Sequence, residues 1–250
     1  MTTPHTKPPA RLSPVVELRQ YDLVPGKRDT LIAIFDSHLV EGQELEEMVI
    51  IGQFRDLDNP DSFVWLRGFA DMEARRRALT GFYSGPVWLA NRDAANATML
   101  RFDNVLQLKP AAPDGGFALD ISERPKPASV EPASGLVAAT IWSLRGDAPA
   151  FAGWHRGHLL PIITEAGAKI IASFVTEPAE NTYPALPVRT NQTVFITFAI
   201  FADSTALDRH RATLAGSPQW NEATSAAAVY LAGQPRTLRL APTARSLLRA

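Results

Sequence analysis

Charged and aromatic side chains recur at every second position of the first predicted strand, and this spacing could build a binding or catalytic site. In a β-strand successive side chains point to opposite faces, so alternate residues share a face. Val16 and Leu18 form an apolar pair that we expect to contact helices. The other face, which we expect to be turned towards a second sheet, then carries Glu17, Arg19 and Tyr21.

A later strand at 63–69 has the same pattern. Val64 and Leu66 would contact the helices, and the residues left on the opposite face are Phe63, Trp65, Arg67 and Phe69. Because these two strands are expected to be neighbours, Glu17, Arg19 and Arg67 should lie together.

Two interpretations of this charged trio remain open. In the first, Arg19 and Arg67 hold an anionic or carbonyl oxygen of a ligand in a largely apolar chamber, with Glu17 beside them. In the second, the trio is a buried ion-pair network that only aligns the two halves of the molecule, and such networks often add little net stability.

The second part of the chain offers a different wall to the same space. By the register of the repeat described below, its inward residues are Ala138, Thr140, Trp142, Phe195, Thr197, Ala199 and Phe201. This wall is small and apolar, whereas the first is charged and aromatic. We therefore expect a ligand pocket between the two sheets, lined by Tyr21, Trp65, Arg67 and Trp142.

His38 and His158 occupy matching ends of two predicted helices and are the candidate catalytic residues. Histidine titrates near neutral pH, so either could transfer a proton. The alternative is a histidine at a helix C-terminus that is stabilised by the helix dipole and a backbone carbonyl. His155 lies three residues before His158, but this pair alone is a weak metal motif, and we expect no metal site.

The segment 177–191 is the largest asymmetry between the two parts, because its counterpart near 56–61 is much shorter. Long connections between adjacent strands are usually functional, and three prolines favour an ordered loop. The segment is interpreted as a lid or an interface arm, with a plain surface loop as the alternative. Tyr183 and Arg189 are the expected contact residues.

Two stretches of the chain share a sequence pattern at a constant offset of 132 residues. Phe69-Ala70-Asp71 returns as Phe201-Ala202-Asp203, and Pro86-x-Trp88 returns as Pro218-x-Trp220. A third pair of motifs has the same offset, and no gap is needed to align all three pairs. The sequence therefore indicates a duplicated unit. We expect a disordered tail at 1–13, a first repeat at 14–110, a proline-rich linker at 111–134, a second repeat at 135–242 and a C-terminal tail at 243–250.

Each repeat has the predicted order strand, helix, strand, strand, helix, strand. This order is typical of a ferredoxin-like α+β unit, whose helices cover one face of an antiparallel sheet. We expect two tandem units whose sheets face each other, as in a dimeric α/β barrel, with room for one small ligand. Free sheet edges would also favour a homodimer or a higher homo-oligomer.

Composition excludes several classes of protein. The formal net charge of −1 lacks the excess of basic residues that nucleic-acid binding requires. The absence of cysteine excludes disulfides and thiolate chemistry. No phosphate-binding glycine loop and no long apolar run are present, so we expect no cofactor, no membrane insertion and a cytoplasmic location.

The chain resembles the NIPSNAP family of the dimeric α/β-barrel superfamily. The motifs that carry this resemblance are Glu17-Leu18-Arg19-x-Tyr21-x-Leu23-x-Pro25-Gly26, Phe35-x-x-His38, Pro86-x-Trp88, Trp154-x-x-x-His158-x-x-Pro161 and Glu180-Asn181-Thr182-Tyr183-Pro184. The resemblance covers about 14–242. It implies relatives that include cofactor-free monooxygenases, haem-degrading and dye-type peroxidases, and proteins that only bind small molecules.

Two functions follow from these observations. The first is a protein that binds a small, partly apolar molecule, as a cofactor-independent oxygenase or an isomerase-like enzyme. The second is a non-catalytic interaction or structural protein with a filled barrel interior. A cavity of ligand size would favour the first, and a packed interior with a fully paired charged trio would favour the second.

Overall fold

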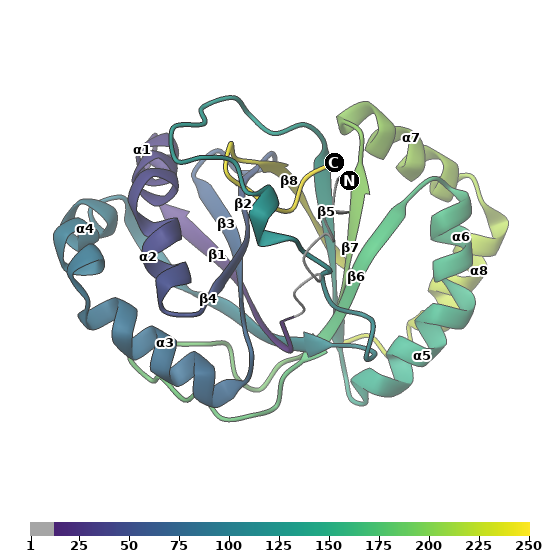
Figure 1. Cartoon of the computed structure of the whole chain (residues 1–250). Helices are drawn as coiled ribbons and strands as arrows, with labels where there is room; N and C mark the ends of the chain where they lie inside the picture. Colours follow the sequence, from purple (N-terminus) through teal and green to yellow (C-terminus); the bar gives the residue numbers. More distant parts are fainter. Residues whose placement is uncertain (1–12) are drawn as a thin grey trace, which may run out of the picture.

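The structure is a computed structural model that describes residues 13–250, and it has two halves with the same order of elements (Figure 1). The first half consists of β1 (Val15–Leu23), α1 (Arg28–Ile34), a π-helical segment (Phe35–Leu39), α2 (Val40–Leu45), β2 (Val49–Asp56), β3 (Ser62–Phe69), α3 (Met72–Ser84), α4 (Pro86–Asn96) and β4 (Met99–Pro110). The second half consists of β5 (Leu136–Leu144), α5 (Ala148–His158), α6 (Leu160–Glu165), β6 (Lys169–Thr176), β7 (Thr193–Phe201), α7 (Ser204–Ala215), α8 (Pro218–Ala227) and β8 (Arg236–Pro242). A short 3-10 helix (Ile121–Glu123) lies between them.

The strands form one closed antiparallel barrel in the order β1-β3-β2-β8-β5-β7-β6-β4. Two seams join the halves: Phe54 of β2 pairs with Pro242 of β8, and Leu108 of β4 pairs with Thr176 of β6. The two expected sheets are thus parts of a single barrel. The free sheet edges on which the prediction of a homodimer was based are paired within the chain. The homodimer therefore stays a prediction, but free edges no longer support it.

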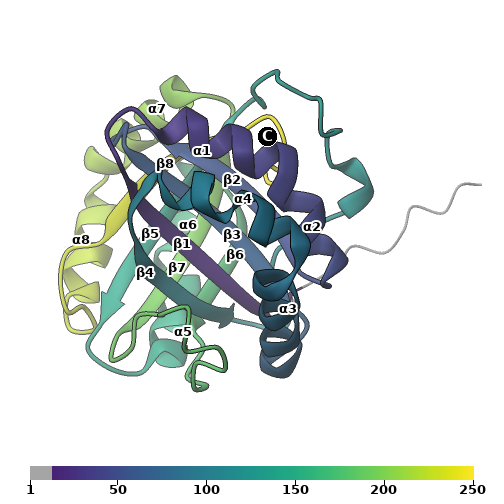
Figure 2. The same ribbon diagram turned by 90° about the vertical axis from the view of Figure 1, so that its left-hand side faces the viewer.

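The barrel interior is an apolar core to which every strand contributes. Its side chains include Val16, Leu18, Val49, Val64, Leu106, Val137, Phe174, Val194 and Leu238. The helices lie outside the barrel. Figure 2 shows α1 to α4 in front of the first-half strands, and α5 to α8 flank the opposite side in Figure 1.

The predicted facing of the strands is therefore wrong, although the grouping of their residues is right. Val16 and Leu18 point into the barrel. Tyr21 and Trp65 belong instead to the core between the first-half sheet and its helices, and Trp142 belongs to the matching core of the second half. The physical reason is that the barrel interior has no access to solvent, so it takes the face of each strand that carries only apolar side chains.

Matching capping interactions begin α3 and α7. The side chain of Asp71 accepts a hydrogen bond from Ala74 N (2.6 Å), and Asp203 does the same with Ala206 N (2.7 Å). A proline begins the helix that follows each of these two, since Pro86 starts α4 and Pro218 starts α8. Proline suits a first helical turn because its missing N–H has no partner there in any case.

The connecting and terminal segments pack against the barrel. In the 111–134 segment, the Phe117 ring lies 5.0 Å from Phe174 and 4.9 Å from Phe198, measured between centroids. Residues 243–250 are also held in place, since Arg245 pairs with Glu41 of α2 and is almost fully buried. The tail expected at 1–13 lies outside the described residues except for its last position.

None of the helices described between residues 13 and 250 combines the length and the apolar character needed to cross a membrane.

Candidate functional site

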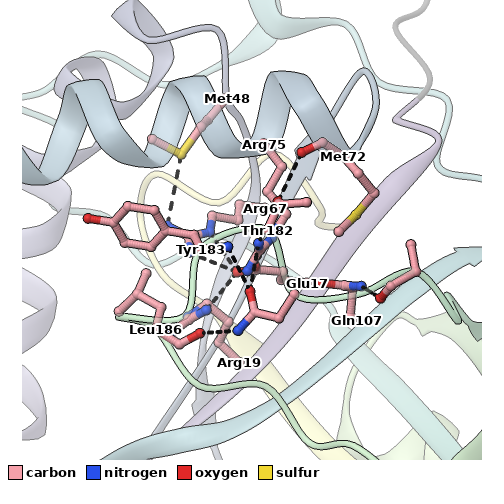
Figure 3. A network of polar contacts seen from close by, with 12 residues as sticks. Glu17, Arg19, Met48, Arg67, Met72, Arg75, Gln107, Thr182, Tyr183 and Leu186 are labelled. Carbon is pink, nitrogen blue, oxygen red and sulfur yellow. Dashed lines mark hydrogen bonds and ion pairs between the residues drawn. The ribbon is translucent and has the colours of Figure 1, made fainter.

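Four fully buried charged side chains meet between the first-half sheet and its helices (Figure 3). Glu17 on β1 lies at the centre. Its Oε2 accepts hydrogen bonds from Arg19 Nη1 (2.6 Å) and Arg67 Nε (2.8 Å). Its Oε1 accepts one from Arg75 Nε on α3 (2.6 Å). We call these four residues the Glu17 cluster. It confirms that Glu17, Arg19 and Arg67 lie together, and it adds Arg75.

The Glu17 cluster is fully ionised. Burial by itself would raise the pKa of Glu17, but the charges of Arg67, Arg19 and Arg75 outweigh it and hold the pKa well below its usual range. Burial opposes the charge of Arg19, yet Tyr21 and Glu17 raise its pKa overall. Burial lowers the pKa of Arg75 against the pull of Glu17. Guanidinium groups keep their proton in proteins, so three positive charges meet one negative charge.

Aromatic rings surround the guanidinium groups. The Cζ atoms of Arg19 and Arg67 lie 5.4 and 5.1 Å from the Trp65 ring centroid, and Arg67 also lies 5.5 Å from that of Phe69. Arg19 Nε donates a hydrogen bond to the Tyr21 hydroxyl (3.0 Å). Burial raises the pKa of Tyr21, which therefore stays neutral at physiological pH.

The 177–191 loop belongs to the second half but crosses to the first, where it passes beneath α3 in Figure 1. Backbone hydrogen bonds to β4 hold both of its ends. Glu177 N donates to Gln107 O (2.9 Å), and Arg189 N donates to Val105 O (2.8 Å). The loop is thus attached at two points across the β4–β6 seam.

The middle of the loop covers the Glu17 cluster. Arg75 Nη1 donates hydrogen bonds to Asn181 Oδ1 (3.0 Å) and Thr182 Oγ1 (3.3 Å). The Tyr183 ring stacks on Tyr83 of α3 with centroids 6.0 Å apart. Of the two contact residues expected from the sequence, Tyr183 therefore packs beside the cluster, whereas the Arg189 side chain is exposed.

The second half has small residues where the first has the cluster. Glu17 and Arg67 are opposite each other on β1 and β3, and the matching pair on β5 and β7 is Ala138 and Ala199. At the position equivalent to Arg75, 132 residues later, the second half has Leu207. The volume that the guanidinium groups fill in one half is consequently open in the other.

A pocket of about 720 Å³ occupies this volume, between the second-half sheet and helices α6 to α8. Its size falls within the range of small-molecule sites. The lining residues that matter most for chemistry are Thr140, Trp142, Thr197, His210 and Trp220. We call it the second-half pocket. Its position corrects the expectation of a pocket between the two sheets, because the barrel interior is the apolar core.

His210 supplies a fixed basic nitrogen at the second-half pocket. Its Nδ1 lies 3.0 Å from Ala166 O, and since a carbonyl oxygen only accepts, Nδ1 must carry the proton. In the neutral imidazole this leaves Nε2 as a hydrogen-bond acceptor. Burial lowers the pKa of His210, an effect that the Ala166 hydrogen bond opposes and Arg211 reinforces. The imidazole is therefore neutral at pH 7 and can accept a proton.

Hydrogen-bond donors complete the pocket. Trp142 Nε1 is buried and has no partner, so a ligand oxygen could satisfy it. The Thr140 and Thr237 hydroxyls bond each other at 3.0 Å, and either can turn towards a ligand. The pocket thus offers an acceptor, Nε2 of His210, and several donors within a mainly apolar wall.

His38 and His158, the histidines singled out in the sequence, are both exposed and do not line the pocket. His158 Nδ1 lies 2.9 Å from Trp154 O, and its ring stacks on Trp154 with a centroid distance of 4.8 Å. This arrangement matches the alternative of a histidine bonded to a carbonyl near a helix C-terminus.

The structure divides the predicted ligand-binding residues between two places. Glu17, Arg19, Tyr21, Trp65, Arg67 and Tyr183 are in or beside the Glu17 cluster, whereas Trp142 lines the second-half pocket. Arg75 and His210 were missed. Both lie on the apolar stripe of their helices, Arg75 with Ala78 and Leu79 and His210 with Leu207, and this position is the signal that could have identified them.

Among residues 13–250, no three His, Asp or Glu side chains are grouped so that they could hold a metal ion.

Comparisons with known proteins support the fold. Residues 16–112 match the NIPSNAP family model, and no curated protein matches the chain. A solved candidate monooxygenase from Fusobacterium nucleatum is 9% identical, with 96% of this chain and 97% of that one covered at a TM-score of 0.60. A second candidate monooxygenase, from Lactobacillus acidophilus NCFM, is 14% identical, with coverage of 92% and 94% and a TM-score of 0.54.

A third solved structure, an anthrone oxidase-like protein, is 10% identical, with coverage of 92% and 91% and a TM-score of 0.52. At such identities the three likenesses show a shared fold and nothing about activity. The family match is confined to the first half, where it includes the strand that carries Glu17, Arg19 and Tyr21. Residues 16–112 of this chain are a NIPSNAP domain.

Proposed function

We propose that the chain binds a small, mainly apolar molecule in the second-half pocket and acts on it as a cofactor-independent oxygenase. The observation that carries this proposal is His210, whose Nδ1–H bond to Ala166 O leaves Nε2 unprotonated at the wall of a ligand-sized pocket. A base held in this way can remove an acidic proton from a bound substrate. This pocket replaces the space between the sheets as the proposed site.

The pocket chemistry suits a planar ketone with an acidic C–H group. His210 Nε2 would take the proton, and Trp142 Nε1 would donate to the carbonyl oxygen on which the negative charge develops. The resulting carbanion is electron-rich enough to react with O2 without a metal or a flavin. In this step the substrate is oxidised and O2 is reduced.

The anthrone oxidase-like neighbour suggests a first substrate to test. For anthrone, one molecule of O2 is consumed, one oxygen atom becomes the new carbonyl of anthraquinone, and the other leaves as water with the two hydrogens of the methylene group. The apolar lining from Trp142, Trp220 and Leu207 favours a three-ring aromatic compound of this type.

Oxygen uptake with anthrone as substrate tests the proposal. We expect the wild-type protein to exceed the buffer rate, and His210→Ala to lower kcat by about 100-fold or more, the usual contribution of a general base. His158→Ala is the matched control, because this exposed histidine is outside the pocket. Equal rates in His210→Ala and wild type would remove His210 from the mechanism.

Three expectations from the sequence are kept as proposals. The two halves are proposed to be tandem ferredoxin-like repeats, which their common element order supports. A homodimer would appear in light scattering at twice the chain mass of 27.3 kDa. A cytoplasmic location fits the absence of cysteine, and cell fractionation would test it.

A further inference from the structure

The Glu17 cluster contains more positive charge than the chain itself neutralises. Three guanidinium groups surround one carboxylate, and all four side chains are fully buried. Within residues 13–250, Glu17 is the one acidic residue paired with these arginines. Two buried positive charges are therefore left over. Buried charge is normally paired, because removing an ion from water costs several kcal/mol.

Several buried donors of the cluster also lack a hydrogen-bond partner. Arg19 Nη2 and Arg75 Nη2 have none, and neither has the indole Nε1 of Trp65. Arg67 Nη2 lies 2.8 Å from a Glu17 oxygen as an ion pair but does not point along a hydrogen-bond direction. Unsatisfied buried donors are rare in folded proteins, and here three of them belong to the arginines that surround one carboxylate.

The geometry points to an anion as the missing partner. We propose that the Glu17 cluster binds an oxyanion group, a carboxylate or a phosphate, beneath the 177–191 loop. Guanidinium groups match the oxygens of both anions in charge and in donor geometry. This site is distinct from the second-half pocket, and the proposal does not depend on the oxygenase activity.

The 177–191 loop provides the way in and the closure. Its ends are fixed to β4 by backbone hydrogen bonds, whereas its middle contacts the first half through Asn181, Thr182 and Tyr183. The middle can therefore lift while the ends stay in place. Once an anion is bound, Arg75 holds Asn181 and Thr182 over the site, so binding and closure of the loop are coupled.

Thermal unfolding in low millimolar phosphate or acetate, at ionic strength held constant with sodium chloride, tests the proposal. Binding to the folded state alone raises Tm in a saturable way. We expect saturation with at least one of the two anions. Phosphate alone would indicate a phosphate ligand, acetate alone a carboxylate, and both a shared site.

Two variants separate this site from a general salt effect. Arg19→Met removes one excess charge and one unpartnered donor. The apparent affinity for the anion, taken from the rise in Tm, should therefore fall at least tenfold. Arg77→Met is the matched control, because Arg77 is an exposed arginine two positions after Arg75 on α3. A linear Tm shift of the same size in all three proteins would overturn the proposal.

Loop closure gives a second measurement that requires only the wild-type protein. A protease that cuts after glutamate can cut after Glu180, which is exposed and precedes Asn181 in the middle of the loop. We expect the responding anion to slow this cut several-fold, while cleavage after exposed Glu222 on α8 is unchanged. Equal rates at the Glu180 site with and without the anion would contradict coupling between the loop and an anion at the cluster.

Discussion

Replacing Glu17 by glutamine is the sharpest test of the electrostatic account of the first half. The change keeps the size of the side chain but removes the one carboxylate that pairs with Arg19, Arg67 and Arg75. Three guanidinium groups would then be buried without a counter-charge. Breaking a buried ion pair from one side costs about 3–5 kcal/mol. This is a large share of the roughly 5–15 kcal/mol by which folded domains are stable.

Urea unfolding at pH 7 measures this loss. Glu73→Gln is the matched control, because Glu73 pairs with Arg76 and Arg77 on the exposed face of α3. We expect the midpoint of Glu17→Gln to fall far below that of the control, with a similar m-value in both. If the two variants lose the same stability, the Glu17 cluster does not have the importance assigned to it.

The difference between wild type and Glu17→Gln should also depend on pH. The pKa of Glu17 is held well below its usual range in the folded state, whereas the unfolded chain has a glutamate pKa of about 4.3. Between these values only the unfolded state takes up the proton. The stabilisation is thus complete above about pH 5 and declines as the pH falls below about 4.3. A difference that stays constant down to pH 3 would refute this reasoning.

Two further predictions concern other parts of the molecule. Burial lowers the pKa of His155 to about 4, so protonation in mild acid favours the unfolded state, and stability should fall as the pH drops below about 6.5. The advantage of His155→Phe over wild type in unfolding free energy should be about 2 kcal/mol larger at pH 5 than at pH 8, as measured by urea unfolding at both pH values. Deleting 178–187 should abolish the rise in Tm with the anion but leave the affinity of an aromatic probe for the second-half pocket unchanged. A loss of that affinity in a fluorescence titration would contradict the separation of the two sites.

The order of elements could be predicted from the sequence because turns, caps and alternation are local signals. The repeated Asp71 and Asp203 caps, for example, are readable in the chain itself. The side of the sheet on which Glu17 lies could not be predicted in the same way. Both faces of β1 and β3 are buried, so alternation separates two sets of residues without saying which one is inside the barrel.

The candidate site was predicted only in part. The proximity of Glu17 to Arg67 follows from neighbouring strands, and the structure confirms it. Arg75 is one of three consecutive arginines, which as a run indicates an exposed helix face, and only its position on the apolar stripe separates it from Arg76 and Arg77. Which residues the 177–191 loop contacts depends on the β4–β6 seam. This seam forms between residues far apart in sequence, so the contacts could not be predicted.

Titration of tryptophan fluorescence with 1,8-dihydroxyanthraquinone tests most directly the claim that the second-half pocket is the ligand site. Trp142 and Trp220 line this pocket, so a bound aromatic probe should quench them. We predict saturable quenching in wild type and its loss in Ala199→Phe, because the larger side chain fills the pocket. Ala118→Phe makes the same change at a separate surface groove and should keep the wild-type affinity. Unchanged affinity in Ala199→Phe would contradict the claim.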